Sequence, residues 1–209
     1  MPGLFVTLEG GEGAGKTTQT RLLAETLIAR GHDAICTREP GGAPGAEALR
    51  RFLLSQDHGL SLRAEATVHF AARIDHLDAA ILPDLQAGRI VLCDRFSDST
   101  LAYQGYGLGY GDPGLLAFIT QLTGLLGIQP AITLVLDVAR AEGRQRLLQR
   151  GEASDRYESL DEAFHQRVAS GFRTIAQQAP ERCMLVSSTG SIEDVHQRLL
   201  DALEPHLPR

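Results

Sequence analysis

The stretch from Leu4 to Thr18, LFVTLEGGEGAGKTT, constrains the fold of this chain more than any other part of the sequence. It opens with a short run of apolar, strand-forming residues, 4–8. The segment from Gly10 to Thr17 then matches the pattern G-x-x-x-x-G-K-S/T at every fixed position. Beyond it, leucine and isoleucine recur at helical spacing. A strand, a glycine-rich loop and a helix in this order predict a phosphate-binding loop.

The residue types of this loop suit a polyphosphate ligand. Glycines let backbone N–H groups turn inward, and the helix that follows adds its positive end. Lys16, the only lysine of the chain, adds a point charge, and Thr17 offers a hydroxyl to Mg²⁺. The residues expected to hold the nucleotide phosphates are Gly10, Gly11, Glu12, Gly13, Ala14, Gly15, Lys16, Thr17 and Thr18.

Composition limits the class of protein. With 209 residues, 43% of them hydrophobic and 22% charged, the chain is expected to form one globular domain, 1–209. A net charge of −6 argues against a general nucleic-acid binder, so phosphate affinity must come from arginines placed locally. The three cysteines are far apart in sequence, which favours free thiols in a reducing compartment. No apolar run suggests a membrane span or a secretion signal, and we expect a cytoplasmic protein.

Strand and helix patterns alternate along the chain. Further strands are expected at 34–38, 90–93, 132–137 and 184–186. Helices are expected at 46–54, 63–85, 97–104, 113–126, 139–149, 161–178 and from 191 onward, with 105–114 as a loop. The helix 63–85 is expected to bend or break before Pro83. This alternation predicts a three-layer α/β fold of the P-loop NTPase type, with about five parallel strands between helices.

Charged residues gather at the predicted strand ends: Glu9, Arg38 with Glu39, Asp94 with Arg95, and Asp137. Because ligands of parallel sheets bind beyond the carboxyl ends of the strands, we expect a site there. The chain contains no asparagine, which excludes the N-K-x-D guanine-recognition motif of GTPases. The G-x-G-x-x-G match at 109–114 follows a helix rather than a strand, so we interpret it as a loop.

A small phosphotransferase explains the arginines best. Phosphoryl transfer needs positive charge around donor, acceptor and migrating group. The candidates for the acceptor side are Arg38, Arg73 and Arg95, and those for a closing lid are Arg144, Arg146, Arg150 and Arg156. Two alternatives stay open at this point: a kinase for another small acceptor, and a P-loop switch protein that binds nucleotide without transferring phosphate.

The chain resembles the bacterial thymidylate kinases over nearly its whole length. The stretches that carry the resemblance are EGGEGAGKTT at 9–18, TREPGG at 37–42, FAAR at 70–73, CDRFSDSTLAYQG at 93–105, LDV at 136–138 and RGEASDRYE at 150–158. The resemblance implies transfer of the γ-phosphoryl group of ATP to dTMP, which gives dTDP and ADP. It also implies Mg²⁺ held by Thr17 and Asp94, a mobile lid at about 150–158, and a homodimer. The implied catalytic residues are Lys16, Arg95, Arg150 and Arg156.

The resemblance also assigns the acceptor site. Arg38 and Arg95 would bind the dTMP phosphate, Glu12 would face the 3′-hydroxyl, and Tyr103 would fill the space of a ribose 2′-hydroxyl. Arg73 would bond the thymine carbonyl, and Thr100 and Gln104 would read the rest of the base edge. The full implied set is Glu12, Arg38, Glu39, Pro40, His69, Phe70, Arg73, Arg95, Thr100, Tyr103 and Gln104.

One position departs from the family pattern. The family usually has phenylalanine four residues before the thymine-reading arginine, as the ring that stacks on the base. Here that position is His69, and Phe70 lies three residues before Arg73. On a helix, His69 is offset from Arg73 by about 40° and Phe70 by about 60° on the other side. We therefore expect His69 to face the base and Phe70 to point toward the core.

Overall fold

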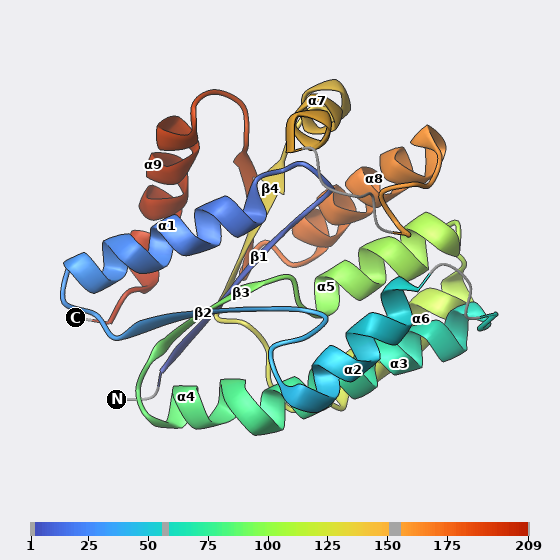
Figure 1. Cartoon of the computed structure of the whole chain (residues 1–209), viewed down its shortest axis with the longest axis horizontal. Helices are drawn as coiled ribbons and strands as arrows, with labels where there is room; N and C mark the ends of the chain where they lie inside the picture. The colour runs from blue at the N-terminus through green and yellow to red at the C-terminus, as the bar shows by residue number, and fades with distance from the viewer. Residues whose placement is uncertain (1–2, 56–58, 151–155, 209) are drawn as a thin grey trace.

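The computed structural model describes residues 3–55, 59–150 without the side chain of Arg150, and 156–208. Its centre is a parallel sheet of five strands in the order β2-β3-β1-β4-β5 (Figure 1). The strands are β1 Leu4–Gly10, β2 Ala34–Arg38, β3 Ile90–Asp94, β4 Ile132–Asp137 and β5 Cys183–Ser187. The sequence prediction of a five-stranded parallel α/β fold is confirmed.

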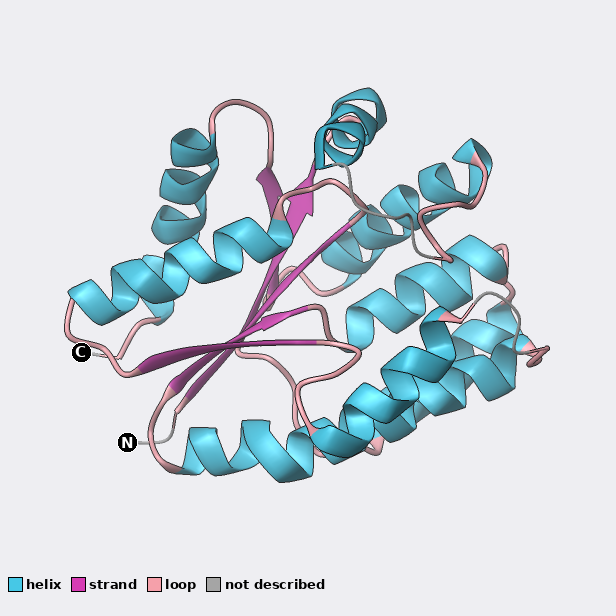
Figure 2. Cartoon of the chain, viewed as in Figure 1, coloured by secondary structure: helices cyan, strands magenta, loops and turns pink. Residues whose placement is uncertain are grey.

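Helices cover both faces of this sheet (Figure 2). The α-helices are α1 Lys16–Ala29, α2 Pro44–Leu54, α3 Leu62–His76, α4 Leu82–Gln86, α5 Ser97–Thr100, α6 Pro113–Gly124, α7 Arg140–Arg150, α8 Glu162–Gln178 and α9 Ile192–Leu203. Two π-helical segments, η1 Leu77–Ile81 and η2 Leu101–Leu108, and one 3₁₀ turn, η3 Glu204–His206, complete the described elements. No helix among the described residues is both long enough and apolar enough to cross a membrane.

Side chains along β1 point alternately to the two faces of the sheet, so they enter two different hydrophobic cores. Val6 and Leu8 enter the core that α1 and α9 cover, together with Leu23 and Leu199. Phe5 enters the opposite core, where it meets the ring of Phe96 edge-on at 5.0 Å between centroids. Because Glu9 has the parity of Phe5, its carboxylate also lies on this second face, where α3, α5 and α8 pack.

The helix through Pro83 behaves as its sequence suggests. It does not stop at the proline, and the π-helical segment η1 comes directly before α4, whose second residue is Pro83. A π-turn widens the helix and accommodates a residue without an N–H. The helix predicted over 63–85 is thus interrupted by η1 before Pro83.

The predicted loop 105–114 is partly wrong, because the helix continues as η2 to Leu108. Gly105 and Gly107 are close-packing positions rather than helix breakers. A Cβ on Gly105 would lie 2.7 Å from the side chain of Leu116, and one on Gly107 would lie 2.6 Å from the ring of Phe164. These contacts join residues that are distant in sequence, so local pattern could not reveal them.

Three predicted helix starts are confirmed by their caps. The Asp112 carboxylate accepts from Leu115 N, and the Asp161 carboxylate accepts from Phe164 N. Ser191 and Asp194 form a reciprocal capping box at the start of α9. The strands 34–38 and 132–137 match the prediction at both ends, and the observed ends of the other elements differ from prediction by a few residues.

Candidate active site

The phosphate-binding loop joins β1 to α1 at the carboxyl edge of the sheet (Figure 1). Gly13 and Gly15 have φ angles of 73° and 88°, which glycine adopts without strain. A Cβ on Gly13 would lie 2.1 Å from the carbonyl oxygen of Gly143, so α7 lies directly against the loop. Lys16 Nζ donates to Gly11 O at 2.9 Å, and the lysine side chain is buried across the loop, which lowers its pKa.

A cavity of about 480 Å³ lies over this loop. It is lined by 12–19 of the loop and α1, by α7 and by the start of α9. Arg146 of α7 donates to Ser188 O at 2.7 Å and borders the same space. Of the nine predicted phosphate-binding residues, Gly10 and Gly11 face a different cavity, between the loop and α8. The other seven line the cavity over the loop.

Two predicted metal ligands lie side by side. Thr17 Oγ1 donates to Asp94 Oδ2 at 2.6 Å, which joins the start of α1 to the end of β3. Hydroxyl and carboxylate oxygens are the hard ligands that Mg²⁺ prefers. Because both residues adjoin Lys16 in one cavity, the pair fits a Mg²⁺ that is bound together with nucleotide phosphates.

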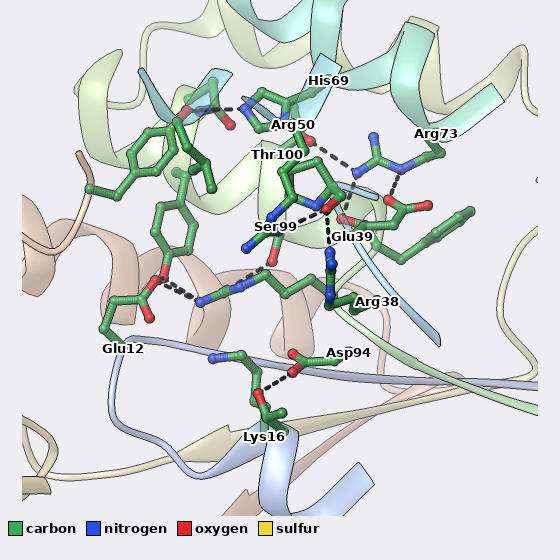
Figure 3. A pocket seen from close by; sticks show the side chains of 18 of the residues that line it. Glu12, Lys16, Arg38, Glu39, Arg50, His69, Arg73, Asp94, Ser99 and Thr100 are labelled. Carbon is green, nitrogen blue, oxygen red and sulfur yellow. Dashed lines mark hydrogen bonds and ion pairs between the residues drawn. The ribbon is translucent and has the colours of Figure 1, made fainter. Parts of the chain in front are cut away.

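A second cavity, of about 340 Å³, opens beside the loop at the same edge of the sheet (Figure 3). The residues of the predicted acceptor site that line it are Glu12, Arg38, Glu39, Pro40, His69, Arg73, Arg95, Thr100, Tyr103 and Gln104. They come from the phosphate-binding loop, the end of β2 with the loop after it, α3, and the continuous segment from Arg95 through α5 into η2. The structure therefore brings together residues from four separate parts of the chain.

Arg95 lines this cavity at the end of β3. It follows β3 directly, with φ of 73°, an uncommon value for a residue other than glycine. Its guanidinium donates to Glu12 Oε1 at 2.7 Å, to Tyr103 Oη at 3.0 Å and to Gly10 O at 3.0 Å. Burial alone would raise the pKa of Glu12, but Arg95 and Lys16 outweigh it and bring that pKa to about 2.

A second carboxylate, that of Glu9, bonds backbone N–H groups of the turn that follows Arg95. Glu9 is fully buried and accepts from Phe96 N at 2.8 Å, from Ser99 Oγ at 2.6 Å and from Ser99 N at 3.2 Å. Ser99 Oγ also accepts from Arg95 at 3.1 Å, so one hydroxyl joins the two side chains. Burial, with the nearby charge of Asp98, raises the pKa of Glu9 to about 7.

Arg73 is held by three partners on one side of its guanidinium. It donates to Glu39 Oε2 at 2.7 Å, to Phe96 O at 2.9 Å and to Thr100 Oγ1 at 3.2 Å. Its Nη1 is buried and has no hydrogen-bond partner within the described part of the chain. An unpaired buried donor of a charged group is costly, and it identifies a position that a ligand acceptor can fill.

Glu39, His76 and Cys93 place three potential metal-ligating atoms within 4.8 Å of one another. Their atoms are already engaged. Glu39 pairs with Arg73, His76 bonds Glu39 at 3.2 Å and Thr37 at 2.7 Å, and the Cys93 thiol donates to Arg95 O at 3.0 Å. We interpret this cluster as structural support for Arg73 rather than as a metal centre.

His69 and Phe70 separate as their helical positions suggest. His69 lines the cavity, whereas the ring of Phe70 packs in the core with Ala66, Leu115 and Ile119. Phe70 therefore does not line the cavity, although the centroid of its ring lies 4.7 Å from the Arg73 guanidinium.

Arg38, predicted to bind the acceptor phosphate, and Arg156, predicted in the lid, each pair with a different glutamate. Arg38 is half exposed at the rim and pairs with Glu47 at 2.9 Å. Arg156 does not line the cavity and pairs with Glu65 at 3.0 Å. Arg150, as a side chain, and residues 151–155, the greater part of the predicted lid, lie outside the described residues.

Sequence reasoning missed three residues of this region. Glu65, Tyr157 and Arg50 were not assigned, yet Tyr157 and Arg50 line the cavity and Glu65 is buried behind it. The signal for Glu65 was weak: one acidic residue on the core-facing side of a predicted helix.

The fold and the two cavities define a class of protein. The phosphate-binding loop has beside it the pair Thr17 and Asp94, which fits Mg²⁺. It faces a separate cavity that is lined by arginines and has room for a second small anion. This is the arrangement of a P-loop phosphotransferase that acts on a small phosphorylated acceptor.

Comparison with known proteins gives the family. The thymidylate kinase family matches residues 8–199, so the chain belongs to the thymidylate kinase family. It is 54% identical to the thymidylate kinase of Gluconobacter oxydans over 205 residues, which cover 98% of this chain and 96% of that protein. It is 49% identical to the thymidylate kinase of Rhizorhabdus wittichii, with 100% of both chains covered. The crystal structure of the Ehrlichia chaffeensis thymidylate kinase superimposes with a TM-score of 0.76 at 36% identity, covering 98% of this chain and 99% of that one.

Proposed function

We propose that this chain transfers the γ-phosphoryl group of ATP to dTMP and so forms dTDP and ADP. Family membership supports the reaction, and the two adjoining cavities supply separate places for donor and acceptor. The single observation that carries the choice of acceptor is Arg73 Nη1, a buried cationic donor without a partner in the described residues. The same guanidinium bonds Thr100 through Nη2, and a carbonyl oxygen of a pyrimidine would satisfy Nη1.

The donor nucleotide binds over the phosphate-binding loop. Backbone N–H groups of the loop and the end of α1 hold its phosphates, and Lys16 adds charge. Thr17 and Asp94 would hold Mg²⁺, which supplies charge neutralisation at the phosphates when it is bound. Lys16 reaches the phosphates by exchanging its bond to Gly11 O for phosphate oxygens.

The acceptor phosphate binds between Arg38 and Arg95. A phosphate monoester oxygen is already ionised near neutral pH, so the reaction needs no general base. The chain's contribution is to position that oxygen and to neutralise charge, with Arg95 at the acceptor side and Arg150 and Arg156 as lid residues. Because Arg156 is paired with Glu65 here, its catalytic role requires it to leave that partner.

The sugar and base occupy the rest of the cavity. Glu12 accepts from the 3′-hydroxyl, and the ring of Tyr103 fills the place of a 2′-hydroxyl. Thr100 and Gln104 read the base edge, and His69 faces the ring of the base. Glu39 and Pro40 complete the wall.

An ADP-release assay across dTMP, dUMP, UMP, AMP and GMP tests the proposal. We expect the highest kcat/KM with dTMP. Arg73→Met should lower it by at least tenfold, whereas Arg21→Met, which removes an exposed pair with Glu25, should leave it unchanged. Turnover of another acceptor would identify a different kinase. Nucleotide binding without turnover of any acceptor would identify a switch protein.

We further propose that residues 1–209 act as one kinase domain and that two copies form a homodimer, as the family resemblance implies. Sedimentation equilibrium in the micromolar range measures the mass directly. A monomer at these concentrations would contradict the dimer without affecting the proposed reaction.

A further inference from the structure

One buried carboxylate lies behind the base end of the acceptor cavity. Glu65 of α3 has a side chain that is only 1% exposed. Its Oε1 accepts from Gln104 Nε2 at 3.0 Å and from the Tyr157 hydroxyl at 2.9 Å. Its Oε2 accepts from Arg156 at 3.0 Å. An ionised carboxylate can only accept hydrogen bonds, so every group around Glu65 must turn a donor toward it.

This requirement fixes the orientation of the Gln104 amide. Both hydrogen bonds of this side chain are donated by Nε2, one to Glu65 and one to the Tyr157 hydroxyl at 3.0 Å. Gln104 lines the acceptor cavity, and its Oε1 accepts no hydrogen bond from the described residues. If the amide were flipped, its oxygen would face the carboxylate oxygen. Glu65 therefore leaves Gln104 to present a carbonyl oxygen, an acceptor, to a ligand.

The same requirement fixes the proton on His69. The Tyr157 hydroxyl has one proton, which it donates to Glu65, so its oxygen accepts from its other neighbours. His69 Nε2 lies 3.1 Å from that oxygen and must therefore carry a proton. One carboxylate thus sets the polarity of Gln104, Tyr157 and His69 together.

Arg156 adds a further donor to the same carboxylate, from its Nη1 to Glu65 Oε2. A neutral acid would be able to donate a proton, and the orientation of Gln104 would no longer be fixed. Arg156 is the first described residue after 151–155, and its pair with Glu65 joins this part of the chain to the base end of the cavity.

We infer that Glu65 is a positioning residue that makes the acceptor cavity select a pyrimidine-2,4-dione over a cytosine ring. The inference rests on the proposed function, because it concerns the base of the proposed acceptor. Uracil and thymine present an N3–H donor flanked by carbonyl oxygens, which match Gln104 Oε1 and Arg73 Nη1. Cytosine presents an N3 acceptor and an amino donor, so both contacts would be reversed. A site built in this way rejects the wrong polarity strongly, because its buried groups are left unpaired.

The test compares dUMP with dCMP, which both lack the 5-methyl group and differ in the polarity of this edge. Isothermal calorimetry measures their dissociation constants in the parent chain and in Glu65→Gln, Glu65→Met, Glu65→Asp and Tyr157→Phe. In the parent, dUMP should bind at least about 100-fold more tightly than dCMP. Glu65→Gln and Glu65→Met release the Gln104 amide, so the ratio should fall at least tenfold in each.

Two variants serve as matched controls. Glu65→Asp keeps an acceptor-only group. Tyr157→Phe removes the hydroxyl that bonds Glu65, Gln104 and His69, but it leaves the bond from Gln104 Nε2 to Glu65. Both should retain the dUMP/dCMP ratio within about threefold, even if both ligands bind more weakly. Circular dichroism and thermal melting check that each chain is folded. If one neutral variant does not fold, the other carries the test.

Several outcomes would overturn the inference. A parent ratio near one would show that the cavity has no such polarity. An unchanged ratio in a folded Glu65→Gln or Glu65→Met chain would show that Glu65 only supports packing, since a purely structural role weakens both ligands equally. Binding does not depend on turnover, so failure of phosphoryl transfer in the ADP-release assay and failure of base selection are separate results.

Discussion

Arg95 donates to Glu12 Oε1 at 2.7 Å, and the Tyr103 hydroxyl donates to the same oxygen at 2.6 Å. This contact joins the phosphate-binding loop to the end of β3, so the donor and acceptor cavities share one ion pair. The side chains of Glu12 and Arg95 are 14% and 16% exposed, which leaves little water to screen their attraction. In the proposed function, this pair would position Arg95 to bind the acceptor phosphate.

Replacing Glu12 by glutamine should change how stability depends on pH. The pKa of Glu12 is lowered to about 2 from an ordinary value of 4.5. A lowered carboxyl pKa stabilises the folded chain above the unfolded value and loses this contribution as pH falls from 4.5 toward 2. The parent should therefore exceed Glu12→Gln in free energy of unfolding at pH 6, by on the order of 3 kcal/mol. Urea unfolding at pH 6, 5, 4 and 3 measures the difference, and a difference constant with pH would contradict the prediction.

Glu9 should behave in the opposite way, although it is close to Glu12 in sequence. Its pKa is raised to about 7, so the folded state holds a proton that the unfolded state loses above pH 4.5. Stability should fall as pH rises from 4.5 to 7. Glu9→Gln should remove this fall, and its free energy of unfolding should improve relative to the parent by about 1–3 kcal/mol across that interval. If the free energies of unfolding of the parent and of Glu9→Gln change with pH in parallel, the pKa of Glu9 is not raised.

Lys16→Met should abolish turnover and leave the fold intact. The lysine side chain is buried against the loop, where burial lowers its pKa. Methionine fills similar space without a buried charge, so thermal stability should be equal or higher. We expect kcat/KM to fall more than tenfold, which corresponds to more than about 1.4 kcal/mol of transition-state stabilisation. Retention of a tenth or more of the parent kcat/KM would refute a phosphate-contacting role for Lys16.

Features that short-range pattern determines were predicted well. The phosphate-binding loop, the five strands and the beginnings of the helices near 113, 161 and 191 each depend on a few neighbouring residues. The convergence of charged residues also followed from pattern, because parallel strands end at one edge. Adjacent ends such as Arg38 and Asp94 pair directly in register.

Features that depend on contacts between distant residues were not predicted. The helix η2 continues through Gly105 and Gly107, where Leu116 and Phe164 respectively pack against its backbone, and no local signal carries that information. Glu65 was missed for the same reason. Its partners lie 39 and 92 residues away in sequence, at Gln104 and Tyr157, and a buried polar network is defined only when all of them are in place.

Tyr103 should set the preference for deoxyribose. Its ring packs edge-on against Tyr157 and Phe164, and its hydroxyl bonds Glu12, so the side chain is held firmly in the cavity wall. We expect the ratio of kcat/KM for dUMP over UMP to fall at least tenfold in Tyr103→Ala, since the ring no longer crowds the 2′ position. Tyr103→Phe keeps the ring and should retain most of the ratio. Equal activity on dUMP and UMP in the parent would exclude this role.

The two neighbours His69 and Phe70 should separate binding from stability. His69 lies in the cavity wall with its Nε2 bonded to Tyr157, and a neutral imidazole there can stack on a base with less apolar area than a phenyl ring. We expect His69→Ala to raise the KM for dTMP several-fold, and His69→Phe to preserve or lower it.

Phe70→Ala should instead act through the core. The side chain is 2% exposed and packs against Ala66, Leu115 and Ile119, so its removal leaves a cavity among residues that cannot readily close it. The free energy of unfolding should fall by about 3–5 kcal/mol, while the KM for dTMP of the chain that remains folded changes little. Urea unfolding and steady-state kinetics on both variants decide the matter. The reverse result, with dTMP affinity lost at Phe70 and stability lost at His69, would mean that α3 is rotated by one residue relative to the cavity.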